Sequence, residues 1–95
     1  MLQKYLVESY WSDRTEFALR DRAARIEVAA LELRDAGQLV TFLGSLFIPS
    51  DEVCFWRFAS ESLSGVEEAS RQAGLSLDRI VQCIELTADE TDNGS

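Results

Sequence analysis

The stretch DEVCFWRFAS, residues 51–60, has the pattern of a β-strand with apolar side chains on both faces. Over residues 53–59, one set of alternate positions holds Val53, Phe55, Arg57 and Ala59, and the other holds Cys54, Trp56 and Phe58. A strand with one face in water is expected to alternate apolar and polar residues. This strand has aromatic rings on both sides and a single charge, so it predicts a central strand whose two faces are both covered.

Three further strands are predicted around it. The first covers residues 3–10, and the second covers residues 40–48, with Gly44 in its middle. A glycine inside a strand often marks a bulge or a close backbone approach. Residues 48–52 include the only proline and predict the turn of a hairpin between the second and third strands. The last strand is expected over residues 78–86.

A long helix is predicted between the first two strands. Ser12 and Asp13 offer an N-cap, and Gly37 suits the position just after the C-terminus of a helix that ends near Ala36. Apolar residues within this segment recur at spacings of 4, 3, 4 and 3: Leu19, Ala23, Ile26, Ala30 and Leu33. The stripe predicts an amphipathic helix with one buried side.

A second helix is predicted from the capping box of Ser64 and Glu67 to Gly74. The element order is then β-α-β-β-α-β, the split βαβ arrangement of the ferredoxin-like fold. Right-handed crossovers give an antiparallel sheet of four strands in the order 4-1-3-2, with both helices on one face. We therefore predict an α+β domain of this type over residues 1–86. Residues 87–95 are expected to form a disordered acidic tail.

Composition argues against several partners and locations. The chain has a formal net charge of −8, whereas phosphate binding needs a basic surface that releases counterions. Neither nucleic acid nor an anionic membrane surface is therefore an expected partner. The first residues lack the apolar stretch of a signal peptide, and no run approaches the roughly 20 apolar residues of a membrane span. Two cysteines do not make a disulfide framework, so a cytoplasmic location is expected.

The second apolar face of the sheet needs a cover that the two helices cannot provide. The predicted strands place apolar groups on both sides of the sheet. Phe55 and Trp56 are expected on opposite faces of the third strand, and Phe42 and Leu43 on opposite faces of the second. A bare apolar patch of roughly several hundred Å² is unusual on a monomer. A second copy that stacks its sheet on this one would bury both patches symmetrically, so we predict a homodimer through the open sheet face. The alternative is a monomer whose uncovered face carries scattered apolar groups.

Several short motifs along the chain also point to a known family. They are YLVESYW at residues 5–11, LGS at 43–45, PSDEVCF at 49–55, AGL at 73–75 and DRIV at 78–81. Together they resemble a family of small, mostly bacterial ferredoxin-like domains of unknown function. The resemblance implies a dimeric α+β barrel and, for one branch of the family, nickel binding. It implies no enzymatic activity.

Five residues are candidate ligand contacts on the open sheet face: Glu8, Tyr10, Phe55, Arg57 and Gln82. In the order 4-1-3-2, Glu8 of the first strand would lie between Gln82 and Arg57, with about 4.8 Å between neighbouring strands. A carboxylate, a guanidinium and an amide among aromatic rings would form the polar end of an apolar cavity. The alternative is a Glu8–Arg57 ion pair that fixes the register of a dimer interface.

Two classes of function fit these features. The first is a small dimeric module that binds an apolar or aromatic small molecule, or a cofactor-independent enzyme in which Glu8 is the base and Arg57 or Tyr10 holds an enolate. The second is a non-catalytic assembly or regulatory module. A cavity larger than roughly 300 Å³ beside Glu8 would favour the first class, and a filled interface would favour the second.

The absence of histidine limits the chemistry. Catalytic triads that depend on an imidazole are excluded. Nickel also favours imidazole nitrogen, so nickel binding is predicted to be weak or absent, although a metal-binding protein like the nickel-binding branch is a further alternative. We predict no metal site and no cofactor.

Cys54 and Cys83 are predicted to be free and buried on the helix-covered face. They fall on the third and fourth strands, with the first strand between them. Two strand spacings of roughly 9.6 Å exceed the limit of about 7 Å between the Cα atoms of a disulfide. The same gap predicts that the two thiolates cannot share a zinc ion.

Overall fold

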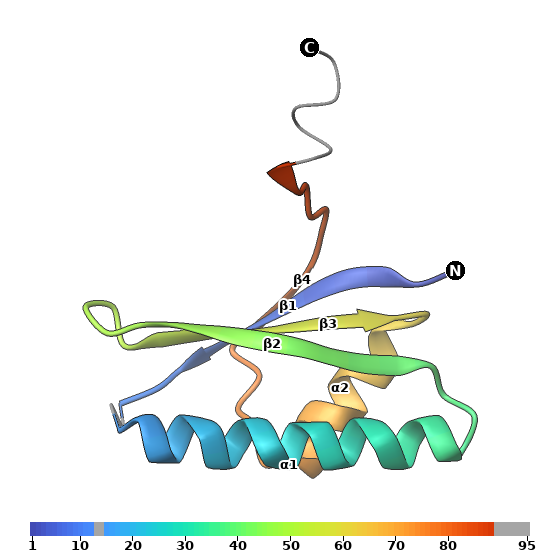
Figure 1. The fold of residues 1–95 in the computed structure, drawn as a ribbon, viewed down its shortest axis with the longest axis horizontal. Helices are drawn as coiled ribbons and strands as arrows, with labels where there is room; N and C mark the ends of the chain where they lie inside the picture. Colours follow the sequence, from blue (N-terminus) through green and yellow to red (C-terminus); the bar gives the residue numbers. More distant parts are fainter. Residues whose placement is uncertain (13–14, 89–95) are drawn as a thin grey trace.

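A computed structural model describes residues 1–12 and 15–88 of the chain (Figure 1). The elements follow in the order β1 (Gln3–Tyr10), α1 (Glu16–Asp35), β2 (Val40–Ile48), β3 (Val53–Ser60), α2 (Leu63–Gln72) and β4 (Arg79–Cys83). The predicted βαββαβ order is confirmed, and the bounds of β1 and β2 agree with the alternation in the sequence.

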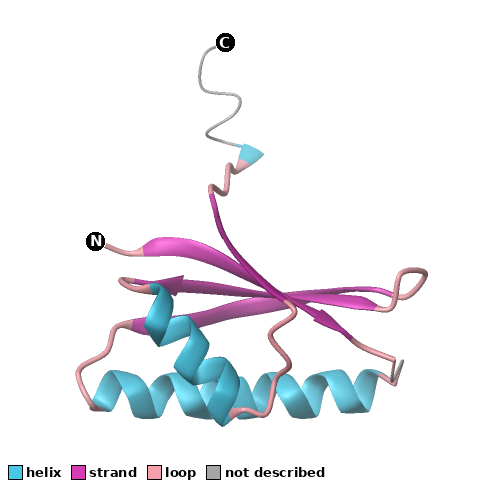
Figure 2. Cartoon of the chain, turned by 180° about the vertical axis from the view of Figure 1, so that it is seen from behind, coloured by secondary structure: helices cyan, strands magenta, loops and turns pink. Residues whose placement is uncertain are grey.

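The strands form one antiparallel sheet in the order β2-β3-β1-β4, which is the predicted order 4-1-3-2 read from the other edge. Both helices lie on the same side of this sheet and leave the other side uncovered, as Figure 2 shows from behind. The register pairs Leu6 with Arg57 and Glu8 with Phe55, and paired residues of adjacent strands share a face. We call the uncovered side, which bears these four residues, the open face.

The core lies between the sheet and the two helices. Trp56 and Phe58 of β3 are its largest fully buried side chains, and Ile26 of α1 and Val66 of α2 pack with them. The ring of Trp11 meets Trp56 edge to face, with 5.7 Å between centroids. The predicted division of β3 into a dry side and an open side is therefore confirmed.

Both helices begin at residues other than the predicted caps. Helix α1 has Thr15 as its N-cap, and the Thr15 hydroxyl accepts a hydrogen bond from the amide of Ala18 at 3.2 Å; Asp13 lies outside the described residues. Helix α2 is capped by Ser62 instead of Ser64, and its hydroxyl accepts from the amide of Gly65. Ser60 Oγ donates to the carbonyl of Ser62, so the chain turns into α2 directly after β3.

The predicted irregularity at Gly44 is confirmed. Phe42 pairs with Phe58 and Gly44 pairs with Arg57, so Leu43 is an extra residue in β2 and forms a β-bulge. Gly44 has a φ of +131°, a conformation that glycine adopts more easily than other residues.

Strand β4 differs from the prediction in both its length and its facing. It ends at Cys83 instead of residue 86. The register pairs Tyr5 with Gln82 and Val7 with Ile80, and because Tyr5 and Val7 are core residues, Ile80 and Gln82 lie on the helix side of the sheet. The prediction that Gln82 lies on the open face is therefore wrong.

Two contacts set the facing of β4 before the strand begins. The hydroxyl of Ser9 donates to the carbonyl of Ser76 at 2.6 Å, and the carboxylate of Asp78 accepts from the amide of Tyr10 at 2.7 Å. These bonds fix where the chain meets β1. A register fixed in this way decides the face of every later side chain, because alternate residues point to opposite sides.

The chain leaves the sheet after β4. Residues 84–88 rise on the side away from the helices (Figure 1), and the predicted acidic tail lies outside the described residues from position 89 onward. Although α1 has 20 residues, neither helix in the described part of the chain is long and apolar enough to cross a membrane.

Candidate functional site

The open face is an apolar surface with charged side chains set into it. Phe55 lies in the row between Glu8 of β1 and Leu46 of β2, because the register pairs it with both. Phe55 is half-buried, while Leu46 is 61% exposed. The half-buried side chains of Leu6, Val53, Ile48 and Val81 extend this surface across all four strands. Large apolar side chains left partly open in one patch are typical of a binding surface.

Glu8 does not pair with Arg57. It lies opposite Phe55 on one side and Arg79 on the other, and its carboxylate forms an ion pair of 3.7 Å with Arg79. Arg57 is two positions away along β3, opposite Leu6. The prediction of Glu8 between Arg57 and Gln82 is therefore wrong, since Gln82 also lies on the other face.

Arg57 takes part in a different cluster, which we call the Glu85 cluster: Lys4, Arg57 and Glu85. Lys4 Nζ donates to Glu85 Oε1 at 3.0 Å, and Arg57 Nη2 donates to Glu85 Oε2. The side chains are about equally exposed, at 41% for Lys4, 36% for Arg57 and 40% for Glu85. The hydrogen bond from Lys4 and the charge of Arg57 hold the pKa of Glu85 below its ordinary value.

A hollow of about 280 Å³ opens next to this cluster on the open face. Leu6 of β1, Leu43 of the β2 bulge and Ile84 after β4 form its apolar wall, and the three members of the Glu85 cluster form its polar rim. Three larger hollows among the described residues, of about 400, 430 and 340 Å³, lie along α1 and are more open to solvent. The hollow on the open face is therefore the strongest candidate site.

Tyr10 lies at the far end of β1 from this hollow. Its side chain is 64% exposed, and its hydroxyl donates to Glu52 Oε1 at 3.3 Å. Of the five predicted contacts, Arg57 lines the hollow, Glu8, Tyr10 and Phe55 lie elsewhere on the open face, and Gln82 lies on the other side of the sheet. The sequence reasoning missed Lys4 and Glu85.

The two cysteines lie on opposite faces of the sheet. Both are free, as predicted. Cys54 is fully buried, and burial raises the pKa of its thiol to about 11. Cys83 pairs with Lys4 on the open face and lines the hollow, so the prediction that it is buried under the helices is wrong. The reason is the facing of β4, which turns its odd-numbered residues outward.

Metal ligands do not converge in the part of the chain that the structure describes. Within residues 1–12 and 15–88, no group of three or more cysteine, aspartate or glutamate side chains is placed to hold a metal ion. Glu8 and Glu85 each face a basic side chain instead. The polar groups of the open face are therefore arranged as ion pairs.

Comparisons with known proteins bear on the fold. No family model matches the chain, and no curated protein matches it either. Among solved structures, the crystal structure of SCO4226 from Streptomyces coelicolor A3(2) aligns with 90% of this chain and 99% of that chain, with a TM-score of 0.67. The two chains share a fold. At 17% sequence identity, SCO4226 supports the ferredoxin-like α+β architecture and carries over no ligand, metal or activity.

Proposed function

We propose that the protein is a homodimeric binding module that holds an apolar small molecule against the open faces of its two sheets. The observation that carries this proposal is the apolar open face with a hollow whose rim is charged. Ligand sites are typically apolar concavities with a few placed polar groups. A second copy stacked on this face would bury Leu46 and Phe55 and would roof the hollow.

Charge favours this face for self-association. The whole chain has a formal net charge of −8, so two copies repel each other at most approaches. On the open face, the basic side chains of Lys4, Arg57 and Arg79 accompany the carboxylates of Glu8 and Glu85. Three positive and two negative charges leave this face close to neutral. Two acidic chains can therefore meet here without the repulsion of the rest of the surface.

Binding is better supported than catalysis. The catalytic alternative needs Glu8 as a base beside Arg57, yet Glu8 faces Arg79 and Arg57 is held by Glu85. In one chain the hollow falls just short of the roughly 300 Å³ of a typical ligand pocket, and it lies beside Arg57 instead of Glu8. The hollow of one chain is therefore an incomplete pocket, and the proposal requires the second chain to enclose a small ligand.

Sedimentation velocity at micromolar concentration tests the dimer. We expect the wild-type protein to sediment at twice the monomer mass of 10.7 kDa, and Phe55→Glu to move toward the monomer because it buries an unpaired charge. Phe17→Glu is the matched control, since Phe17 is 81% exposed on α1. Circular dichroism verifies that both variants are folded. A wild-type protein at the monomer mass would contradict the dimer.

Fluorescence of N-phenyl-1-naphthylamine, a neutral apolar dye, tests the binding site. We expect the wild-type protein to enhance the dye emission, and Leu6→Glu to abolish the enhancement by placing a charge in the wall of the hollow. Leu31→Glu, on α1 where Leu31 is 45% exposed and lines none of these hollows, is expected to behave like the wild type. Equal enhancement by all three proteins, or by none, would contradict a site at this hollow.

A further inference from the structure

The Glu85 cluster has the form of an occupied anion site. Lys4 and Arg57 come from neighbouring strands, and both direct their donors at the two oxygens of one carboxylate. A guanidinium and an ammonium on the same carboxylate make charge-assisted hydrogen bonds, the arrangement by which proteins bind free carboxylates. Here the carboxylate belongs to the chain itself.

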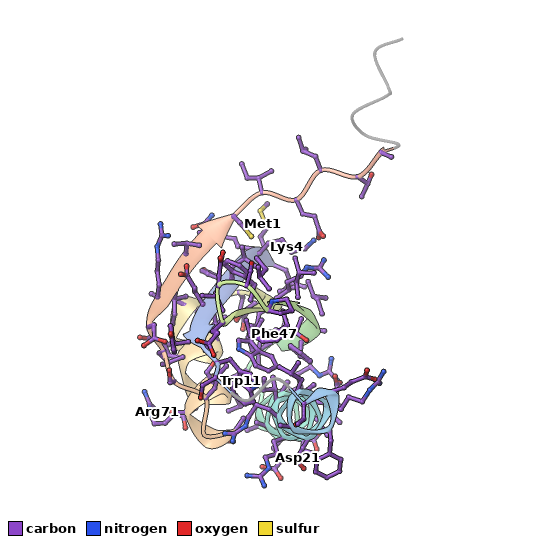
Figure 3. All side chains as sticks on the ribbon, turned by 90° about the vertical axis from the view of Figure 1, so that its left-hand side faces the viewer. Met1, Lys4, Trp11, Asp21, Phe47 and Arg71 are labelled. Atoms are coloured by element: carbon purple, nitrogen blue, oxygen red, sulfur yellow. The ribbon has the colours of Figure 1, made fainter. Side chains whose placement is uncertain are left out.

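The cations are fixed more firmly than the anion. Lys4 and Arg57 lie within β1 and β3, the two inner strands of the sheet. Glu85 lies beyond the end of β4, in a segment that extends away from the body of the domain (Figure 3). Its neighbours Ile84 and Leu86 are 87% and 66% exposed, so little packing holds the segment in place. The carboxylate can therefore leave while the two cations stay.

The side chains around Glu85 define which ligand could replace its carboxylate. Leu6 and Leu43 line the hollow next to the two cations. If Glu85 moves away, two positive charges are left at the rim of an apolar wall, and like charges placed together favour a bound anion. A ligand that matches both features has an apolar body and one carboxylate.

We propose that Glu85 is a tethered occupant of an anion subsite formed by Lys4 and Arg57, and that the ligand of the open face is a small apolar carboxylate that displaces it. This inference rests on the proposed function, because it names the ligand class of the same hollow. Glu85 then competes with the ligand, and the fraction of chains with the subsite open sets the apparent affinity.

An NMR titration of the full chain with 4-phenylbutyrate and with 4-phenylbutanol tests the proposal. The two probes share an apolar body and differ in the carboxylate. We expect the wild-type protein to bind the carboxylate more tightly than the alcohol, with shifts in the amide signals of residues around the hollow. Acetate, which lacks the apolar body, is expected to bind far more weakly than 4-phenylbutyrate.

Removal of the tethered carboxylate is the decisive comparison. Glu85→Gln is expected to tighten 4-phenylbutyrate binding by about threefold or more, since the competing ion pairs are half-exposed and individually weak, and to leave 4-phenylbutanol unchanged. Arg57→Gln and Lys4→Gln are expected to weaken 4-phenylbutyrate. Glu68→Gln is the matched control, because Glu68 is a half-exposed carboxylate paired with Arg71 on α2.

The outcomes separate this proposal from the proposed function. If both probes bind the hollow equally and Glu85→Gln changes neither affinity, the binding module stands and the carboxylate subsite is wrong. If neither probe binds any variant and the neutral dye also fails, both are wrong. An equal gain for Glu85→Gln and Glu68→Gln would show an effect of net charge alone and would overturn the subsite.

Discussion

Arg57 of β3 and Glu85, which follows β4, form an ion pair across the open face, although they are 28 positions apart and β1 lies between β3 and β4. Lys4, from the intervening strand, donates to the same carboxylate. The segment after β4 is thus tied to the middle of the sheet by charge instead of backbone pairing. Because both pairs are half-exposed, this connection is expected to be weak and readily reversed.

The pH dependence of this connection follows from Glu85. Its folded-state pKa is depressed by Lys4 and Arg57, so the cluster contributes stability above the unfolded-state pKa of a glutamate. That contribution is lost as the pH falls through the folded-state pKa. We expect the side-chain carboxyl signal of Glu85, followed by NMR, to titrate below the ordinary glutamate value. Arg57→Gln is expected to move it upward, and a wild-type titration at the ordinary value would contradict the cluster.

The cysteines are expected to differ in reactivity. Cys54 is buried with its pKa raised to about 11, so it should react with a disulfide reagent only on unfolding. Cys83 is half-buried on the open face and should react in the native protein, and Cys83→Ser should abolish this native phase.

The rate at which Cys83 reacts in the native protein also reports on dimer formation. If two chains stack on the open face, Cys83 is shielded in the wild type. We therefore expect faster reaction in Phe55→Glu than in the wild type at the same protein concentration. Equal rates in the two proteins would speak against stacking on this face.

Arg22 is expected to contribute more to stability than Arg20 of the same helix. Arg22 Nη1 donates to the carbonyls of Ala73 and Gly74 at 2.9 and 2.6 Å, and its guanidinium lies 5.5 Å from the ring centroid of Trp11. Arg22→Ala is expected to lower the free energy of unfolding by about 1–3 kcal/mol.

Arg20→Ala is the control for that substitution. Arg20 forms an exposed pair with Glu16 within α1, and its loss is expected to cost less than about 0.5 kcal/mol. Urea denaturation measures both values. Equal losses would show that the contacts of Arg22 with the end of α2 do not stabilise the fold.

Gly44 is expected to resist substitution for a backbone reason. A Cβ at this position would meet nothing closer than Arg57 Nη1 at 3.8 Å, so there is space for alanine. Its φ of +131° is strained for any residue with a Cβ, and Gly44→Ala is expected to cost about 1–3 kcal/mol in unfolding free energy. Ser45→Ala, at the next and exposed position, should cost less. Equal midpoints in urea would contradict the role of the backbone.

The order of elements could be predicted because its signals are local. Gly44 marks the bulge within its own strand, Gly37 follows the end of α1, and the alternation of β3 separates Trp56 from Phe55. Each signal depends on a few adjacent residues. Topology then follows from general rules of handedness.

The side of the sheet on which each β4 side chain lies depends on contacts that are distant in sequence. Ser9 and Tyr10 bind the chain just before β4, and no local pattern shows where those bonds form. One local signal in the sequence does indicate the correct side. Arg79 and Glu85 belong to the same alternate set as Cys83, and two charges in a set assigned to a dry core would be costly.

The candidate site could be predicted only in part for the same reason. Arg57 was assigned to the correct face because its own strand alternates clearly. Its partner could not be found, because a strand predicted to residue 86 places Glu85 in the alternate set of Cys83, on the helix-covered side, whereas β4 ends at Cys83 and Glu85 meets Arg57 on the open face. The register between strands decides that Glu8 meets Arg79, and register depends on the packing of the whole sheet.

The β-bulge at Leu43 and the brevity of β4 together affect how copies of this chain aggregate. An unpaired sheet edge can template another strand, and repeated pairing of this kind produces fibres. One edge strand here is interrupted by an extra residue, and the other has only five residues. Both edges are poor templates, so growth along the hydrogen-bonding direction is disfavoured. At high concentration the chain is therefore expected to form closed oligomers of fixed size in preference to filaments.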